Sequence, residues 1–511
     1  GGASPTIEGN TITGAETGIE IEAAGGLVRG NRISGGKWGI YLRDGTTAIV
    51  EDNVVDGSEN IAISALGTGA APTITGNEVV AGDDAWGIWA GEGASATVND
   101  NRVTGGISGV FLEDTDSLVE GNMITGARTG ITAREGATAT IEGNTVSDSE
   151  GYGIEIVGTD TRPTVRENAV AGNHTGISVL EGAAPLVEDN AITDQSNAGV
   201  WIGGDGTEPT LRGNRISGSE LGIVAIGGTT ATIEGNEIAG NKAGVSISGS
   251  GTTPIVRDNT ITDGGRGISV NGGATPSIAG NELSGHATGI TISDIGTAAA
   301  IAGNVVVANE VGIKVSGGAA PSIEDNTISD NSDAGIRVDG LGTSPTIEGN
   351  TLRGNGTDLD VGIWSAPTLM DNDLEPVPLA TPRPLDEVAP EIMARVEELR
   401  GLQAKTDIPI RYVDQQEAVL EHMAELEDED IEELRAEEAL LKRVGLLPRE
   451  MDLLATLESF VESEVAGYFR PEFGDIAIVD DDGLLQQEGE WALAHEYVHA
   501  LQDQHFGIEA T

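Results

Sequence analysis

The chain has 511 residues, no cysteine and a net charge of −56 at pH 7. Without cysteine, disulfide bonds and thiolate metal sites are excluded. The strong acidic balance excludes nucleic acid and anionic membrane surfaces as partners. No apolar run in the sequence is long enough to span a bilayer. The chain begins with Gly1 rather than Met, so we expect a piece of a longer protein whose export signal is not present here.

Residues 1–373 consist of a short repeat. Most of the 75 glycines lie in this part of the chain. An asparagine recurs at steps of 21 to 24 residues, from Asn10 to Asn372. About nine residues after these asparagines comes a second signal, a glycine followed by alternating apolar residues, as in Gly18-Ile19-Glu20-Ile21. A period in this range is typical of solenoid proteins.

The content of each repeat indicates which kind of solenoid this is. Alternating apolar residues predict strands rather than helices, and the glycine, asparagine and aspartate between them predict turns. We therefore predict a mostly β fold, a right-handed parallel β-helix of about 17 coils. One asparagine per coil would stack on its copies, and the side-chain amides would bond along the stack as a ladder. Asparagine also tolerates the left-handed turn conformation, so we assign this column a structural role.

The repeat resembles the right-handed parallel β-helix repeat family, which has a pectate-lyase-like fold and includes periplasmic NosD-type proteins. The resemblance covers about residues 4–373. It implies the fold and leaves the activity open.

Several aromatic residues follow the Gly-Ile signal at the position that would face outward. Tyr41, Trp89 and Phe111 fall in the second, fourth and fifth coils. Aromatic rings on a sheet face can stack on sugars, although partly packed surface aromatics are the simpler interpretation. A polysaccharide or a cell-surface glycan is the ligand that such a platform would take.

The composition changes after residue 373. Five prolines over residues 374–390 predict an extended linker. Residues 391–511 are rich in helix formers and predict a smaller, mainly helical α+β domain that is incomplete at its C-terminus. The expected elements are a helix over 391–402, a strand over 408–413, helices over 415–447 and 451–469, a strand over 475–479 and a helix over 488–506.

The last expected helix carries the pattern H-E-x-x-H, as His495-Glu496-Tyr497-Val498-His499. On a helix, positions i and i+4 share a face, so both imidazoles can bind one metal ion. Glu496 is turned about 100° from His495, where it can act as the general base. The expected cofactor is zinc, with His495 and His499 as ligands and Glu496 as the catalytic residue. An apolar stripe of Trp491, Ala494, Val498 and Leu501 would dock this helix on a core.

A catalytic zinc site normally has three protein ligands, and the third is open here. His505 follows His495 by ten residues, the spacing of the metzincin motif H-E-x-x-H-x-x-G-x-x-H. Gln502 replaces the glycine that breaks the helix in that motif, so His505 would point roughly 80° away from His495. A glutamate beyond Thr511 is the alternative.

The segment 466–506 is similar to a family of bacterial zincin-type metallopeptidase domains, with a GxYxP turn, an edge strand and a helix reading H-E-x-x-H-A-L-Q-D-Q-H-F. The resemblance covers about residues 388–511. It implies that His495 and His499 bind zinc and that Glu496 is the general base. It also implies that Asp475–Val479 is the edge strand to which a peptide substrate adds.

Two functions follow from these patterns. The first is a secreted or cell-surface zinc metallopeptidase that acts on a peptide or protein and is carried on a β-helix scaffold. The second is a non-enzymatic surface protein whose β-helix serves in adhesion or carbohydrate binding. Both place the protein outside the cell or at its surface.

Overall fold

The computed structural model describes residues 4–362, 364–374, 383–414, 417–419, 421, 435–436, 438, 442, 467–471, 473–479, 484–485 and 487–506. The chain divides into two compact units, Gly1–Glu375 and Pro376–Thr511. Most of the predicted helix 415–447 and residues 451–466 of the predicted helix 451–469 lie outside the described residues.

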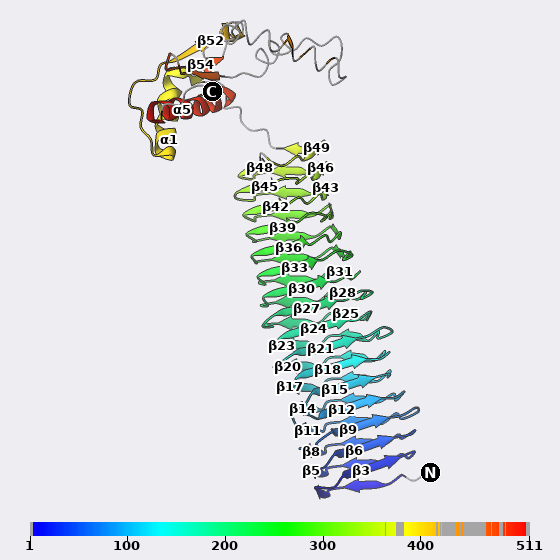
Figure 1. Ribbon diagram of the computed structural model, residues 1–511. Helices are drawn as coiled ribbons and strands as arrows, with labels where there is room; N and C mark the ends of the chain where they lie inside the picture. Colours follow the sequence, from blue (N-terminus) through cyan, green and yellow to red (C-terminus); the bar gives the residue numbers. More distant parts are fainter. Residues whose placement is uncertain are drawn as a thin grey trace. The chain divides into compact units, whose positions relative to one another are not determined.

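The first unit is a parallel β-solenoid (Figure 1). Each coil contributes one strand to each of three sheets. The first sheet has 17 strands, from β1 (Thr6–Glu8) to β49 (Thr368–Met370), and the third has 16, from β3 (Thr17–Glu22) to β48 (Thr357–Val361). The second sheet runs from β2 (Thr11–Thr13) to β50 (Asp373–Leu374). The solenoid therefore has about 16 full turns, close to the predicted number.

Stacked apolar columns form the core of the solenoid. The isoleucine of each Gly-Ile signal lies directly over its copy in the next coil, as for Ile19 and Ile40 or Ile63 and Ile88. These residues are almost wholly buried, in one continuous cluster with the inward residues of the other two sheets. The alternating pattern therefore places one side chain of each pair in the core and the next one outside.

The predicted asparagine ladder is confirmed. The backbone N–H and the side-chain Nδ2 of Asn214 both donate to Oδ1 of Asn236, each at 3.0 Å, and Asn236 donates in the same way to Asn259. The left-handed conformation, however, falls on the residue before the asparagine, as at Gly9 (φ 66°) and Asp52 (φ 56°). The asparagine is thus selected for its amide bonds rather than for the turn.

A second polar ladder, which was not predicted, lies five residues after the first in several coils. Its members hydrogen-bond from coil to coil through the backbone N–H of one and the side chain of the next. Their identities vary. They include Asn173, Gln195, Asn241, His286, Asn309, Asn331 and Asn355.

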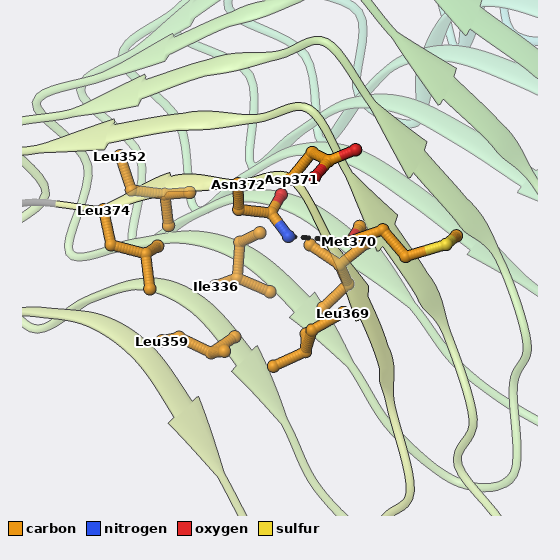
Figure 2. Close-up of a pocket in the computed structure, with 9 residues that line it drawn as sticks. Ile336, Leu352, Leu359, Leu369, Met370, Asp371, Asn372 and Leu374 are labelled. Atoms are coloured by element: carbon orange, nitrogen blue, oxygen red, sulfur yellow. Dashed lines mark hydrogen bonds between the residues drawn. The ribbon is translucent and has the colours of Figure 1, made fainter.

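The C-terminal end of the solenoid is apolar and hollowed. Figure 2 shows Ile336, Leu352, Leu359 and Leu369 around this hollow, with Asn372 beside it. Its volume is about 150 Å³. Leu369 is 49% exposed because no later coil among the described residues covers it.

The second unit has a small mixed sheet and two described helices. Helix α1 (Leu385–Arg400) packs against α5 (Gln487–Phe506), which also contacts β53 (Gly467–Arg470) and β54 (Asp475–Val479). The sheet order is β52-β54-β53, where β52 (Ile410–Val413) is parallel and β53 antiparallel to β54. A two-residue pairing joins β51 (Arg383–Pro384) to β55 (Leu484–Leu485).

Three sequence predictions for this unit need correction. Helix α1 begins at Leu385, inside the range predicted as an extended linker, and Pro390 lies within the helix. Residues 467–470 form strand β53 rather than the end of a helix. The segment Asp475–Val479 is a strand as predicted, but it is the central strand of the described sheet rather than its edge, because β52 and β53 pair on both sides. None of the helices in the described ranges combines the length and apolar character that a membrane crossing requires.

Candidate metal centre

Helix α5 presents the H-E-x-x-H residues by burying the opposite side. Leu493, Tyr497, Ala500 and Leu501 are at most 1% exposed and pack against α1 and the sheet. The predicted stripe is therefore shifted. Only Leu501 of its members is fully buried, whereas Ala494 and Val498 are half-buried; the side chain of Trp491 lies outside the described part of the chain. Since the core takes Tyr497, the two flanking histidines face away from it.

His495 and His499 come together as predicted. Their Nε2 atoms lie 3.2 Å apart and both imidazoles are exposed. Two nitrogens bound to one tetrahedral zinc ion at ~2.0–2.1 Å would be separated by about 3.3 Å. The separation of the two Nε2 atoms therefore matches that of two ligand positions of such an ion.

A hollow lies beside the histidine pair. It has a volume of about 400 Å³. Half-buried Ala494 and Val498 form its apolar floor, and exposed Arg400 lies at its border. The complete lining comprises Val396, Arg400, Ala494, His495, Val498, His499 and Gln502. The hollow can hold a side chain next to any group that the two histidines bind.

The carboxylate of Glu496 is hydrogen-bonded to the sheet. Its Oε2 accepts a hydrogen bond of 2.9 Å from the backbone N–H of Phe469 in β53. Among the described strands, β53 is at the edge of the sheet, and this N–H lies on the side away from β54. The carboxylate is therefore fixed between the metal-binding face of α5 and the free edge of β53.

Tyr497 anchors the helix from inside the motif. Its hydroxyl donates to Oε1 of Glu397 in α1 at 2.8 Å, and burial together with this carboxylate raises the pKa of Tyr497. Glu397 also accepts the backbone N–H of Ala404 at 3.0 Å. The bond between Tyr497 and Glu397 positions α5 on α1, and no local pattern predicts it because the two residues are 100 positions apart.

His505 is occupied elsewhere. Its Nε2 lies 2.8 Å from the carbonyl oxygen of Gln403. The neighbouring Gln504 bonds Lys405 and Thr406, which fastens the end of α5 to the loop after α1. Within the described ranges, no group of three or more histidine, aspartate or glutamate side chains converges on one point. Of the two candidate sources of a third ligand, the structure places His505 away from the pair.

Charged residues form hydrogen bonds and ion pairs on the sheet to which Glu496 is bonded. Arg470 donates from Nε to Asp475 at 2.8 Å, and these hydrogen bonds hold the pKa of Asp475 below its usual value. Arg411 also reaches Asp475, at 3.3 Å, and Tyr468 donates to Glu421 at 2.6 Å. This network fixes the turn between β53 and β54.

The predicted aromatic residues lie on the outer face of the solenoid's third sheet. Trp89 and Phe111 are in contact, with ring centroids 5.2 Å apart, whereas Tyr41 is two coils away and contacts Trp38 instead. Phe111 is only 5% exposed, so it supports its neighbours rather than offering a ring face. Trp38 and Trp86 precede the Gly-Ile signals and were not singled out from the sequence; Trp38 contacts Tyr41, and Trp86 contacts Trp89 and Phe111.

Comparison with solved structures gives distant likenesses. A mutant of the periplasmic alginate epimerase AlgG is 15% identical over 56% of this chain and 77% of that chain, with a TM-score of 0.36. A hyper-glycosylated fragment of TibA is 13% identical over 71% of this chain and 99% of that chain, with a TM-score of 0.28. The A-module of the mannuronan C-5 epimerase AlgE4 of Azotobacter vinelandii is 14% identical over 69% and 88%, with a TM-score of 0.27. These values are too low to bear on activity.

No curated protein matches the chain. The model of a protein family does, in three overlapping stretches at residues 1–124, 108–252 and 199–352. That family is described as the right-handed β-helix region, which agrees with the parallel coils of the first unit. Since these stretches span well over half of the 511 residues, the chain belongs to the right-handed β-helix family.

Proposed function

We propose that the protein is a zinc metallopeptidase carried on a β-solenoid and located outside the cell or at its surface. The observation that supports this most directly is the 3.2 Å separation of the two Nε2 atoms of His495 and His499. Two imidazoles at this distance, beside a hollow and next to a glutamate, match the donor set that H-E-x-x-H proteins use for zinc.

The chain's own residues have separate tasks in this proposal. His495 and His499 would hold the ion, which when bound supplies a Lewis acid for a peptide carbonyl. Glu496 takes the proton from the attacking water and passes it to the leaving amine. The hydrogen bond that Glu496 accepts from the backbone N–H of Phe469 keeps the carboxylate beside the edge of β53.

Strand β53 is the place where a peptide would add to the sheet. Its outer edge has no strand partner among the described strands. The backbone N–H of Phe469 on that side is bonded to Glu496, so a peptide would bond main-chain groups of this edge other than that N–H. An extended peptide held there by main-chain bonds would lie next to Glu496. The hollow between α1 and α5 would then receive one of its side chains.

Metal content tests the assignment. The full chain loaded with zinc and desalted should retain about one ion, and His495→Ala or His499→Ala should lose it. His505→Ala is the matched control and should keep the metal, because His505 bonds Gln403. A wild-type chain that takes up no zinc, or a His495→Ala variant that still binds it, would contradict the proposal.

Activity tests the role of Glu496 separately. Glu496→Gln should retain zinc and lose at least about 100-fold in the hydrolysis of unfolded casein, because a general base contributes roughly 10²–10⁴-fold. Equal rates for Glu496→Gln and the wild-type protein would exclude Glu496 as the base.

A further inference from the structure

The outer face of the solenoid's third sheet carries an aromatic patch, defined as Trp38, Tyr41, Trp86, Trp89 and Phe111. It lies over β6 (Trp38–Arg43), β9 (Ile61–Leu66), β12 (Trp86–Gly91) and β15 (Ser108–Glu113). Trp86 contacts both Trp89 and Phe111, with centroids 5.3 and 5.8 Å apart, and Trp38 contacts Tyr41 at 6.0 Å. The proposed peptidase site uses none of these residues.

The indole of Trp89 lies close to its own strand. A Cβ atom on Gly91 would be 2.7 Å from Nε1 of Trp89, so the indole rests along its own strand over this glycine. In the coil between Tyr41 and Trp89, Ser64 faces outward in the same column and yet is wholly buried. The large side chains on either side therefore cover the strand between them. Strand β9, which lies between the two groups of rings, is buried along its whole length.

The arrangement of a tryptophan beside a glycine two positions later occurs in two strands of this sheet. Trp201 rests on Gly203 in β27 (Ala198–Gly203), where a Cβ atom would be 3.2 Å from the indole Nε1. Among the six-residue strands of the third sheet, β12 and β27 are the ones that end in glycine, and both carry tryptophan two positions earlier. Glycine at this position thus accompanies an indole that lies flat.

The charges around the patch indicate which ligand it fits. Arg43 is paired with Glu20 at 3.0 Å and Glu22 at 2.9 Å, and Arg134 is paired with Glu113 at 2.7 Å while it covers Phe111. Both of these guanidinium groups are already neutralised, and the chain carries a net charge of −56. An anionic polymer would be repelled, whereas hydroxyl groups can bond the carboxylates at both borders.

We propose that this patch binds an uncharged polysaccharide. The apolar face of a sugar ring stacks on a partly exposed aromatic ring, and Trp38, Tyr41, Trp86 and Trp89 are all partly exposed. Successive strands are ~4.8 Å apart, so the patch spans several sugar units along the solenoid axis. The carboxylates of Glu20, Glu22 and Glu113 fix the orientation through the hydroxyl groups.

Native affinity electrophoresis of the full chain tests this proposal. Gels would contain dextran, galactomannan, xyloglucan, a soluble β-1,3-glucan, alginate or gelatin. We expect retardation by at least one uncharged polymer and none by alginate. Trp89→Ala and Trp86→Ala should each weaken the apparent affinity at least tenfold. Gly91→Ala should also weaken it, because the new Cβ atom would lie 2.7 Å from Nε1 of Trp89 and 2.9 Å from the backbone oxygen of Glu113, so both the indole and the neighbouring strand must shift.

Trp201→Ala is the matched control. Trp201 belongs to the same sheet and lies beside Gly203 as Trp89 lies beside Gly91, but it is outside the patch. Its removal should therefore leave binding unchanged. Unfolding midpoints of all variants check that the solenoid is intact. The proposal is overturned if no uncharged polymer retards the protein, if retardation survives Trp89→Ala, or if alginate binds equally well. Retardation by gelatin alone would overturn it in favour of a protein ligand.

Discussion

His286 occupies the second polar ladder, at a position that asparagine holds in later coils. Its Nδ1 lies 3.1 Å from the backbone nitrogen of Gly264, and its Nε2 lies 3.0 Å from the carbonyl oxygen of Ile261. Because a backbone N–H can only donate and a carbonyl can only accept, Nδ1 must be unprotonated and Nε2 must carry the hydrogen. The folded solenoid thus requires neutral histidine at this position.

This requirement predicts a loss of stability in acid. Burial lowers the pKa of His286, against smaller opposing effects of its two backbone bonds and Asp263. Since the folded value lies below the unfolded one of about 6.5, the stabilisation is present above that pH and is lost as the pH falls. The urea midpoint should therefore fall more between pH 7.5 and 5 for the wild-type protein than for His286→Asn. Parallel pH profiles for the two proteins would contradict this.

At the scale of the element, the asparagine ladder holds neighbouring coils together through buried bonds. Asn236 Oδ1 accepts both donors of Asn214, and its own Nδ2 also reaches the carbonyl oxygen of Leu211 at 3.0 Å. Asn214, Asn236 and the next member, Asn259, are at most 1% exposed. Removing one carboxamide therefore leaves the backbone N–H of the asparagine in the coil before it with neither a protein acceptor nor water.

Asn236→Ala should accordingly be strongly destabilising. A buried group left without a partner costs about 1–3 kcal/mol, and this change orphans the backbone N–H of Asn214, whereas its Nδ2 keeps the carbonyl oxygens of Val187 and Arg212. Asn10→Ala is the comparison, because Asn10 is exposed and gives up only its own donor bonds. Urea denaturation followed by circular dichroism measures both. A similar loss for the two variants would show that the buried bonds are not the source of the effect.

The same scale explains what the sequence could predict. The solenoid and its first ladder could be predicted because each coil has asparagine at the same position, for example Asn214 and then Asn236, at a nearly constant step. The second ladder was missed because asparagine, glutamine and histidine all serve in it, as at Asn173, Gln195 and His286. What repeats there is the hydrogen-bond geometry and not the residue type.

In the second unit, the sequence predicted features that depend on local spacing, but it did not predict the pairing of strands that are distant in the chain. The helix of His495 and His499 followed from spacing alone. The central place of β54 could not be predicted, because its partner β52 lies more than 60 residues earlier in the chain. Strand β53 was missed because its four residues continue the apolar spacing of the preceding segment. The contact of Glu496 with Phe469 depends on that strand and was missed with it.

At the scale of the whole molecule, the two units have separate hydrophobic cores. The solenoid core runs from Ile19 to Leu352, whereas the other centres on Val388, Leu493 and Tyr497. Each unit therefore has its own source of stability. We expect two unfolding transitions in calorimetry of the full chain.

A chelator should separate the two transitions if the second unit binds zinc. EDTA should lower the midpoint of one transition and leave that of the other unchanged, because a metal stabilises only the unit that holds it. The His495→Ala variant should show no response to EDTA in either transition. A shift of both transitions, or an equal shift in His495→Ala, would mean that the metal binds elsewhere.

The asparagine ladder also determines how the solenoid can change in length. The residues that it joins are 21 to 24 positions apart, yet the bond between their amides keeps the same length of 2.9–3.0 Å. The ladder thus requires one asparagine per coil, and its geometry does not depend on the number of residues between two successive asparagines. Extra residues can bulge outward between two asparagines without changing the register of the neighbouring coils. A whole coil can be gained or lost in the same way. The scaffold is therefore one that duplication and deletion of single coils can lengthen or shorten.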